Sequence, residues 1–369
     1  MNLRRSFWIW FQNLGGTCPV ASFPPYGAWR EFIQFAAQWQ IDSVIIWFPF
    51  SYMEGRAEDW KWPPRRGMFG PFGKEIVQYA HDQGVQFICG FPLNGYDVGA
   101  FILKEHPELQ AKIPPELANT PKGKDSVGKV FCPSNETSQQ MVQELLNILV
   151  EETGVDGFNF ESGAVDYVTC HCPRCEKRFQ SRGETEHENK PILWDIEQIN
   201  AAIDFLESKG KGLQFSMDAI YGQVADPETL AKEIDRRCTI LWGDWENFPD
   251  VGMMKELVNI RKNTGAMLRL HLLREPGQQA LTQIVESCRK LGSLGLREIA
   301  GRAWIPRGWN AVKDALFAEA TKNPWRSDSE FQTLIEKLYS RYPFQKGEEE
   351  VPPGDYNKIE GEWSLVNIV

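Results

Sequence analysis

The chain has 369 residues, of which 42% are hydrophobic and 24% are charged, a composition typical of globular proteins and unlike that of disordered ones. Its 50 acidic and 40 basic side chains give a formal charge of -10, which argues against a general nucleic-acid-binding function. No apolar run reaches the roughly 18 to 20 residues that a membrane-spanning helix requires. We therefore expect a soluble protein without a nucleic-acid or membrane partner.

The N-terminal segment and the cysteine content indicate where the protein works. Residues 7–11 are apolar and follow a basic start, but this stretch is too short for the apolar region of a signal peptide and no small-residue cleavage site follows. Eight cysteines in 369 residues are too sparse for a secreted disulfide scaffold. We expect a reducing, cytoplasmic location, and the sequence leaves open whether the chain forms an oligomer.

Short apolar segments alternate with amphipathic segments along the chain, in the pattern of a buried strand followed by a helix. The predicted strands are residues 7–12, 43–48, 86–91, 157–161, 213–220, 239–245, 266–273 and 298–305. The predicted helices are residues 29–39, 74–83, 138–152, 194–208, 227–236, 252–263, 278–291, 309–321 and 329–342. Several helices end before the next strand at a glycine, where a left-handed cap residue belongs, as at Gly84, Gly154 and Gly265.

This alternation predicts an α/β fold, a (β/α)8 or TIM barrel with a short C-terminal helical extension, because a doubly wound sheet rarely repeats the unit so evenly. A doubly wound dinucleotide-binding fold would also carry a glycine-rich phosphate turn after its first strand. The residues there, Gln12-Asn13-Leu14-Gly15-Gly16, do not form G-x-G-x-x-G. We predict that residues 1–325 form the catalytic barrel and that residues 326–369 form a helix and tail packed on it.

The C-terminal ends of the strands, which we call the mouth of the barrel, carry the functional residues in this fold. Side chains alternate along a strand, so if Glu161 points into the mouth then Asn159 does too, while Phe158 and Phe160 point outward. The pairs that alternation aligns on later strands are Ser216 with Asp218, Trp242 with Asp244, Arg302 with Trp304, and Arg269 with His271 and Glu275. So many polar groups pack a barrel poorly, and we expect most of them to bind substrate. The candidate substrate-binding residues are Asn159, Trp10, Trp47, Asp218, Trp242, Asp244, Arg269, His271, Arg302 and Trp304.

Two carboxylates at the mouth indicate glycoside hydrolysis. That reaction needs one carboxyl to protonate the leaving oxygen and a second to attack the anomeric carbon or to activate water. Glu161 on the fourth strand is our candidate acid/base, and Glu275 after the seventh is our candidate nucleophile. The alternative is that these carboxylates only pair with arginines or cap helices. Tryptophans near the strand ends favour a sugar substrate, although each could equally pack in the core.

A second signal is the C-x-C-x-x-C cluster at Cys170, Cys172 and Cys175, in the segment after the fourth strand. Three thiols within six residues can surround one zinc ion, and a tetrahedral structural site needs a fourth ligand. Cys132, which lies just before the third long helix, is the candidate, with His171 as the alternative. Four protein ligands leave no open position, so we expect a structural zinc. The remaining alternative is a group of metal-free surface thiols.

The run from Gly157 to Phe179, together with the segment Phe131-Cys132-Pro133-Ser134-Asn135, resembles the catalytic barrel of family 42 β-galactosidases and related clan A retaining glycoside hydrolases. The resemblance implies an oligosaccharide or glycoside substrate, a retaining mechanism with Glu161 as acid/base, and a nucleophile on the seventh strand, here Glu275. It also implies one zinc ion held by four thiolates. The ligands it implies are Cys132, Cys170, Cys172 and Cys175.

The sequence departs from this family in two respects that bear on the sugar. Clan A enzymes usually carry an asparagine immediately before the acid/base, and this chain has Phe160 there, with Asn159 one place earlier. An adjacent Asp-Glu pair, which would suggest substrate-assisted cleavage of N-acetylhexosamines, is absent from the fourth strand. The chain is also about half the usual family length, so the resemblance is that of a distant relative.

Arginines crowd the last two strands and raise a question about substrate charge. Guanidinium groups suit carboxylates and sulfates, so a uronic or sulfated sugar is one hypothesis, and the other is that the arginines orient neighbouring carboxylates. The arginines concerned are Arg269, Arg274, Arg302 and Arg307.

Two other functional classes remain open. A metal-dependent hydrolase or deacetylase would use His271, Asp218 and Asp244 around a catalytic ion. A non-catalytic or degenerate carbohydrate-binding barrel would bind sugar without turning it over, and the missing asparagine before Glu161 points that way.

Overall fold

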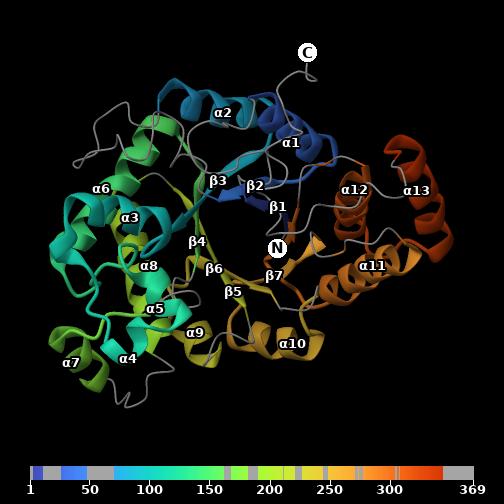
Figure 1. The fold of residues 1–369 in the computed structure, drawn as a ribbon. Coiled ribbons are helices and arrows are strands. Elements are labelled where there is room, and N and C mark those ends of the chain that lie inside the picture. Colours follow the sequence, from blue (N-terminus) through green and yellow to red (C-terminus); the bar gives the residue numbers. More distant parts are fainter. Residues whose placement is uncertain are drawn as a thin grey trace.

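The protein folds into a closed barrel of eight parallel strands in chain order, surrounded by helices, which confirms the predicted TIM barrel (Figure 1). The computed structural model describes residues 3–10, 26–47, 70–161, 168–181, 190–210, 212–220, 227–243, 248–270, 273, 277–303, 306 and 308–343. The strands are β1 (Arg4–Trp10), β2 (Ser43–Trp47), β3 (Gln86–Pro92), β4 (Gly157–Glu161), β5 (Gln214–Ile220), β6 (Cys238–Gly243), β7 (Thr264–Leu268) and β8 (Glu298–Arg302).

The helices that match the predicted amphipathic segments each lie outside the barrel (Figure 1). They are α1 (Tyr26–Gln38), α2 (Gly70–Asp82), α6 (Glu136–Thr153), α8 (Lys190–Glu207), α9 (Pro227–Glu233), α10 (Val251–Ile260), α11 (Gln278–Gly292) and α12 (Gly308–Lys322). A further helix, α13 (Asp328–Arg341), packs against α12. Beyond its end, the Tyr342 hydroxyl accepts a hydrogen bond from Trp39 Nε1 at 3.2 Å, which ties this extension to the end of α1. No helix in the described part of the chain is long and apolar enough to cross a bilayer.

Local sequence signals explain where several helices begin. Asn135 accepts a hydrogen bond from the backbone N–H of Thr137 at the start of α6, and Asp250 does the same for Met253 in α10. Ser327 and Glu330 form a reciprocal capping box at the start of α13. These side chains satisfy backbone donors that have no partner within the helix.

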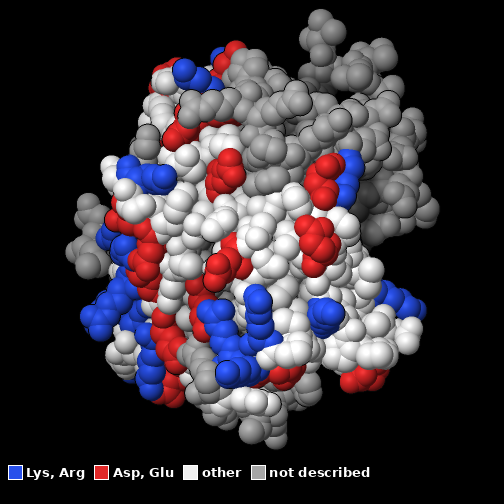
Figure 2. Space-filling view, turned by 90° about the vertical axis from the view of Figure 1, so that its left-hand side faces the viewer, with Lys and Arg blue, Asp and Glu red and all other residues white. Residues whose placement is uncertain are grey.

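The structure contains short helices that periodicity did not predict. Between β3 and α6 the chain forms α3 (Tyr96–Glu105), η3 (Pro107–Leu109), α4 (Pro115–Ala118) and α5 (Pro121–Ser126), and after β4 it forms α7 (Pro173–Ser181). Figure 1 shows them on the side of the barrel that carries α6 and α8. Figure 2, which views this side directly, shows described acidic and basic side chains interspersed over it.

Gly265 has a different role from the predicted helix cap. Gly84 and Gly154 do adopt left-handed backbone angles, with φ of 74° and 75°. β7 begins two residues before the predicted strand, however, so Gly265 lies inside it. A Cβ at Gly265 would come within 2.8 Å of the Glu298 carbonyl oxygen and 2.7 Å of Leu241 Cδ2. The glycine is required there by the close approach of β8 and not by a turn.

The space between strands and helices is filled by apolar side chains, as the alternation along β4 predicts. Phe158 and Phe160 are fully buried, and their rings are stacked with centroids 6.1 Å apart. Phe215 on β5 continues this stack at 6.4 Å from Phe160. Aromatic rings therefore occupy the outer face of β4 and β5, which leaves the opposite face of these strands for the barrel interior.

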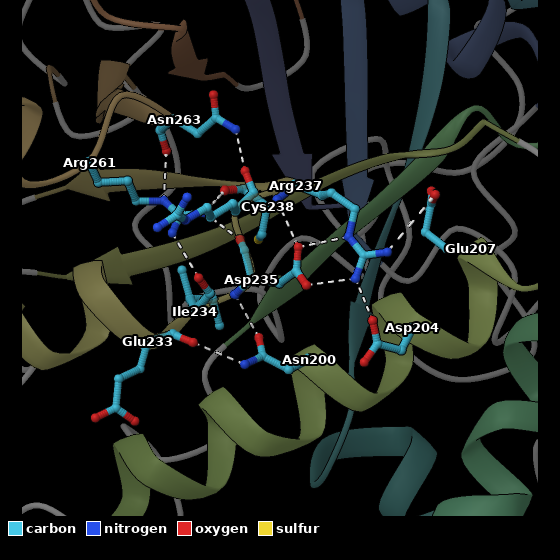
Figure 3. A network of polar contacts seen from close by, with 11 residues as sticks. Asn200, Asp204, Glu207, Glu233, Ile234, Asp235, Arg237, Cys238, Arg261 and Asn263 are labelled. Carbon is cyan, nitrogen blue, oxygen red and sulfur yellow. Dashed lines mark hydrogen bonds and ion pairs between the residues drawn. The ribbon is translucent and has the colours of Figure 1, made fainter.

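Arg261, which follows α10, joins the beginnings of β6 and β7 to the end of α9 (Figure 3). Its guanidinium is buried and donates to backbone carbonyls, including that of Ile234 at 2.8 Å and that of Cys238. Beside it, Asp235 accepts hydrogen bonds from Arg237, and this contact lowers the pKa of the Asp235 carboxyl. The network satisfies buried carbonyls at the end of the barrel opposite the mouth, so we assign it a structural role.

Candidate active site

Asn159 lies at the centre of a hydrogen-bonded layer inside the barrel. Its side chain is fully buried, and its amide nitrogen donates to Ser216 Oγ at 2.9 Å and to Asp218 Oδ1 at 3.0 Å. Trp8 Nε1 on β1 donates to the Asn159 amide oxygen at 3.0 Å. Three strands thus fix one side chain, and these contacts place the alternate residues of β4 and β5 on the interior face.

Glu161 and Asp218 are neighbours at the mouth. Glu161 ends β4, and its Cα is paired in the parallel ladder with that of Asp218 on β5. Paired positions on adjacent parallel strands direct their side chains to the same face, and such strands lie about 4.8 Å apart. Both side chains are partly buried. Two acidic side chains therefore share the interior face at the mouth of the barrel.

Asp218 has a strongly altered acidity. Removal of the Asp218 carboxyl from water raises its pKa to about 7. A hydrogen bond from Asn159 and the positive charges of Arg302 and Arg269 lower the pKa, but by less than desolvation raises it. Glu298, lower in the barrel, raises it further. Desolvation is the dominant effect, so the carboxyl is about half protonated near neutral pH.

The two described arginines of the mouth are held by the barrel itself. The Arg302 guanidinium on β8 lies 4.3 Å from the centroid of the Trp8 ring, in the geometry of a cation–π contact. Arg269 follows β7 and is buried, and its Nε lies 3.9 Å from where a Cβ of Gly243 would stand. At that distance an alanine at position 243 would only contact the arginine, so Arg269 packs beside the end of β6.

Below this layer the interior is closed by a polar floor. Glu298 on β8 accepts hydrogen bonds from Arg4 Nε at 2.8 Å and from Ser6 Oγ at 2.5 Å, and Ser6 contacts Ser43 at 2.8 Å. Both charges of the Arg4–Glu298 pair are largely shielded from solvent. The floor lies toward the end of the barrel opposite the mouth, at the starts of β1, β2 and β8.

Trp242 differs from its expected place in the mouth. Its side chain is fully buried, and its Cα pairs with those of Ala219 and Ala266. Leu241 is the β6 residue paired with Asp218, so Leu241 faces the interior and Trp242 faces the helices. This position fits packing between strand and helix and does not fit stacking on a sugar.

Several expected site residues cannot be placed. Glu275, Asp244, His271 and Trp304 lie outside the described residues. The backbones of Trp10 and Trp47 pair with each other at the ends of β1 and β2, but their side chains lie outside the described part of the structure. Of the expected mouth residues, the structure therefore brings together Glu161, Asn159, Asp218, Arg269 and Arg302.

A buried lysine that the sequence analysis missed lies next to the segment that carries Glu275. Lys313 on α12 is 1% exposed, and its Nζ donates to the carbonyl oxygen of Leu273 at 2.9 Å. Trp309 Nε1, one helical turn earlier, donates to the same oxygen at 2.8 Å. Leu273 is two residues before Glu275 in the chain. In the sequence, the only indication of this contact is that Trp309 and Lys313 are four residues apart and so lie on one face of a helix.

The structure brings together the four cysteines Cys132, Cys170, Cys172 and Cys175, with all sulfur atoms within 4.8 Å of one another. Cys132 Sγ lies 3.7 Å from Cys172 Sγ and 3.6 Å from Cys175 Sγ, and the last two are 3.4 Å apart. Four sulfurs placed tetrahedrally about 2.3 Å from a zinc ion would be about 3.8 Å apart. The donor set and its spacing therefore fit a four-thiolate metal site.

The surroundings of the cluster favour a thiolate. Cys170 Sγ accepts a hydrogen bond from the backbone N–H of Lys112 at 3.2 Å. Hydrogen bonds from Cys132 and Cys175, with this backbone contact, lower the pKa of Cys170 to about 4, while the pKa of Cys132 is raised. The His171 Nδ1 atom lies 2.8 Å from Glu176 Oε1, so Cys132 and not His171 completes the group of four.

No protein-family model matches the sequence, and no curated protein matches it. Solved structures do resemble its fold. A β-N-acetylhexosaminidase from Bacteroides fragilis superposes with a TM-score of 0.58 at 14% identity, covering 93% of this chain and 71% of that one. Another β-N-acetylhexosaminidase gives 0.61 at 12% identity, covering 94% and 80%. A GH36 α-galactosidase from Geobacillus stearothermophilus gives 0.50 at 11% identity, covering 91% of this chain and 41% of that one. At these identities the likeness shows a shared fold and nothing further.

Proposed function

We propose that the protein is a glycoside hydrolase that cleaves a glycosidic bond with two carboxylates, Glu161 as acid/base and Glu275 as nucleophile. The observation that carries the proposal is the position of Glu161 at the end of β4, on the interior face fixed by Asn159 and beside Asp218. The likeness of the fold to structures of glycosidases supports the same class of reaction. An oligosaccharide or glycoside is the corresponding substrate.

The reaction would proceed in two steps. Glu161 gives its proton to the glycosidic oxygen, which keeps the electron pair of the breaking bond, while Glu275 forms a bond to the sugar carbon. Water then attacks that carbon, Glu161 takes the proton of the water, and Glu275 leaves as a carboxylate. Asn159 cannot leave its hydrogen-bonded position without leaving buried polar groups unpaired, so it would keep Trp8, Ser216 and Asp218 in place.

The test is hydrolysis of a panel of aryl glycosides by the wild type and by Glu161→Gln and Glu275→Ala variants. We expect each variant to lose at least about a thousandfold in kcat/KM. We also expect azide to restore some turnover in Glu275→Ala but not to stimulate the wild type, because a small anion can replace the missing nucleophile. Glu144→Gln, which changes an exposed carboxylate on α6, is the matched control. Full activity of Glu161→Gln would refute the proposal, and binding of sugar without turnover by the wild type would indicate a carbohydrate-binding barrel.

The identity of the sugar is a second part of the proposal. The positive charges of Arg269 and Arg302 act on Asp218 at the mouth, and this supports a substrate with a carboxylate or sulfate group. The panel should therefore compare neutral, uronic, sulfated and N-acetylated glycosides. The N-acetylated compounds are included because two of the similar structures are β-N-acetylhexosaminidases. Equal kcat/KM for neutral and anionic glycosides would refute the proposal that the substrate is an anionic sugar.

We further propose that the four cysteines hold one structural zinc ion. The ion would join the segment before α6 to α7 and would occupy all four tetrahedral positions with thiolates, leaving none for substrate. Metal analysis of the purified protein tests this, with one zinc per chain expected. A second ion held by oxygen and nitrogen ligands, required for turnover, would instead favour a metal-dependent hydrolase.

A further inference from the structure

The relation between Glu161 and Asp218 goes beyond a shared place in the mouth. Their Cα atoms are paired across β4 and β5, and both carboxyls share the face that carries Asn159. Because neighbouring strands lie about 4.8 Å apart, two ionised carboxylates at these positions would repel each other strongly in a partly buried site.

The groups that face Asp218 from the neighbouring elements do not bring its pKa down to the ordinary value. Asn159 on β4 donates to Asp218 Oδ1, and Arg302 on β8 and Arg269 after β7 act on it through their positive charge. Glu298 on β8 acts in the opposite sense. β6 contributes Leu241 at the paired position, which adds no charge. Burial nevertheless leaves the Asp218 carboxyl with a pKa of about 7, so this carboxyl is about half protonated near neutral pH.

We propose that Glu161 and Asp218 form a coupled pair that holds one proton, and that Asp218 keeps Glu161 able to act as an acid at neutral pH. Asp218 does not contact the reacting atoms; it acts by keeping the proton on Glu161, and is therefore a positioning residue. In the first step the proton passes from the pair to the glycosidic oxygen, and both carboxyls are then ionised. In the second step the proton from the attacking water returns to the pair. The inference rests on the proposed hydrolase function, because it assigns a partner to the acid of that reaction.

A coupled pair titrates in two steps that belong to both groups, and the last proton leaves at a higher pH than it would from either group alone. Activity that requires this proton declines on the alkaline side when it is lost. Replacing Asp218 with Asn removes one negative charge and keeps an oxygen for the Asn159 amide. The alkaline limb of kcat/KM in Asp218→Asn should therefore lie at least about one pH unit below that of the wild type. Above the limb, the variant should then be about tenfold less active relative to its maximum than the wild type is.

The experiment compares the pH profiles of the wild type, Asp218→Asn and Ser216→Ala. Ser216 accepts from the same Asn159 amide but carries no charge, so its replacement perturbs the network and should leave the alkaline limb in place. An alkaline limb in Asp218→Asn within about 0.3 units of the wild type would overturn the inference. Normal activity in Glu161→Gln would instead overturn the hydrolase function itself.

A second measurement does not depend on a known substrate. With carboxyl-labelled aspartate, the 13C resonance of Asp218 is identified by its loss in Asp218→Asn, and its titration is followed in the wild type and in Glu161→Gln. The midpoint for Asp218 should fall by at least about half a unit when the neighbouring charge of Glu161 is removed. An unchanged midpoint would overturn the coupling even if Asp218→Asn were inactive.

Discussion

The buried carboxyl of Asp218 predicts a specific pH dependence of stability, which replacement by Asn should remove. In the folded protein its pKa is about 7, whereas the ordinary value is 3.8. The folded state therefore binds this proton more tightly than the unfolded chain does. The stability that results is fully present below about pH 4, is lost as the pH rises toward 7, and stays constant above that.

The size of the effect follows from the two pKa values. Between pH 5.5 and pH 8 the linkage amounts to about 2 kcal/mol of stability lost by the wild type. Because Asp218 is only partly buried, water screens it, and we expect about 1 to 2 kcal/mol. Asp218→Asn cannot titrate, so its stability relative to the wild type should improve by this amount over the same range.

Urea denaturation of both proteins at several pH values provides the measurement. Comparing the difference in the free energy of unfolding between the two proteins at each pH removes the contribution of the other titrating groups. A difference that stays constant from pH 5.5 to pH 8 would refute the claim that burial dominates the acidity of Asp218. If instead the arginines outweigh desolvation, the carboxylate is ionised throughout this range, and the difference changes only below about pH 4.

Three further outcomes follow from the structure. Cys132→Ser should lower bound zinc well below one per chain by metal analysis, whereas Cys288→Ser, at a buried position outside the cluster, should retain it. Arg261→Met leaves several buried carbonyls without a donor and should lower the free energy of unfolding by about 2 to 4 kcal/mol in urea, and an unchanged midpoint would contradict its structural role. Gly265→Ala should cost about 1 to 3 kcal/mol by the same assay. Gly277→Ala should change little, because its added Cβ meets no atom of the described residues within 4 Å.

The strands of the barrel could be predicted because parallel strands buried on both faces have continuous apolar sequences. The same property conceals which residues face the interior. On β4 the polar Asn159 between Phe158 and Phe160 indicates the answer, and the hydrogen bonds of Asn159 agree with it. On β6 the sequence around Leu241 and Trp242 has no such contrast. Since shifting by one residue exchanges the two faces, Trp242 was expected in the mouth although it packs against the helices.

The short helices around the cysteine cluster had no periodic signal because contacts with distant residues hold them. Val168, beyond β4, donates its backbone N–H to Ser126 Oγ in α5 at 2.8 Å. A helix of six residues is unstable alone and depends on such contacts. The sequence motif did identify the cysteines, because their spacing is set by the geometry of a metal site and not by the period of a helix.

Near each proposed catalytic residue in the sequence, one residue is held by hydrogen bonds from outside the barrel strands. Cys170, nine residues after Glu161, is held by the backbone of Lys112 and belongs to the cysteine cluster. Leu273, two residues before Glu275, is held by Lys313 on α12. A charge as deeply buried as that of Lys313 is costly, and in the sequence it reads as an ordinary exposed lysine on a helix. Barrel strands define where a carboxylate can stand, and these outer contacts hold Cys170 and Leu273, which lie near the two carboxylates in the sequence. Reading strand ends alone therefore finds candidate carboxylates but cannot determine their spacing, which distinguishes a retaining from an inverting reaction.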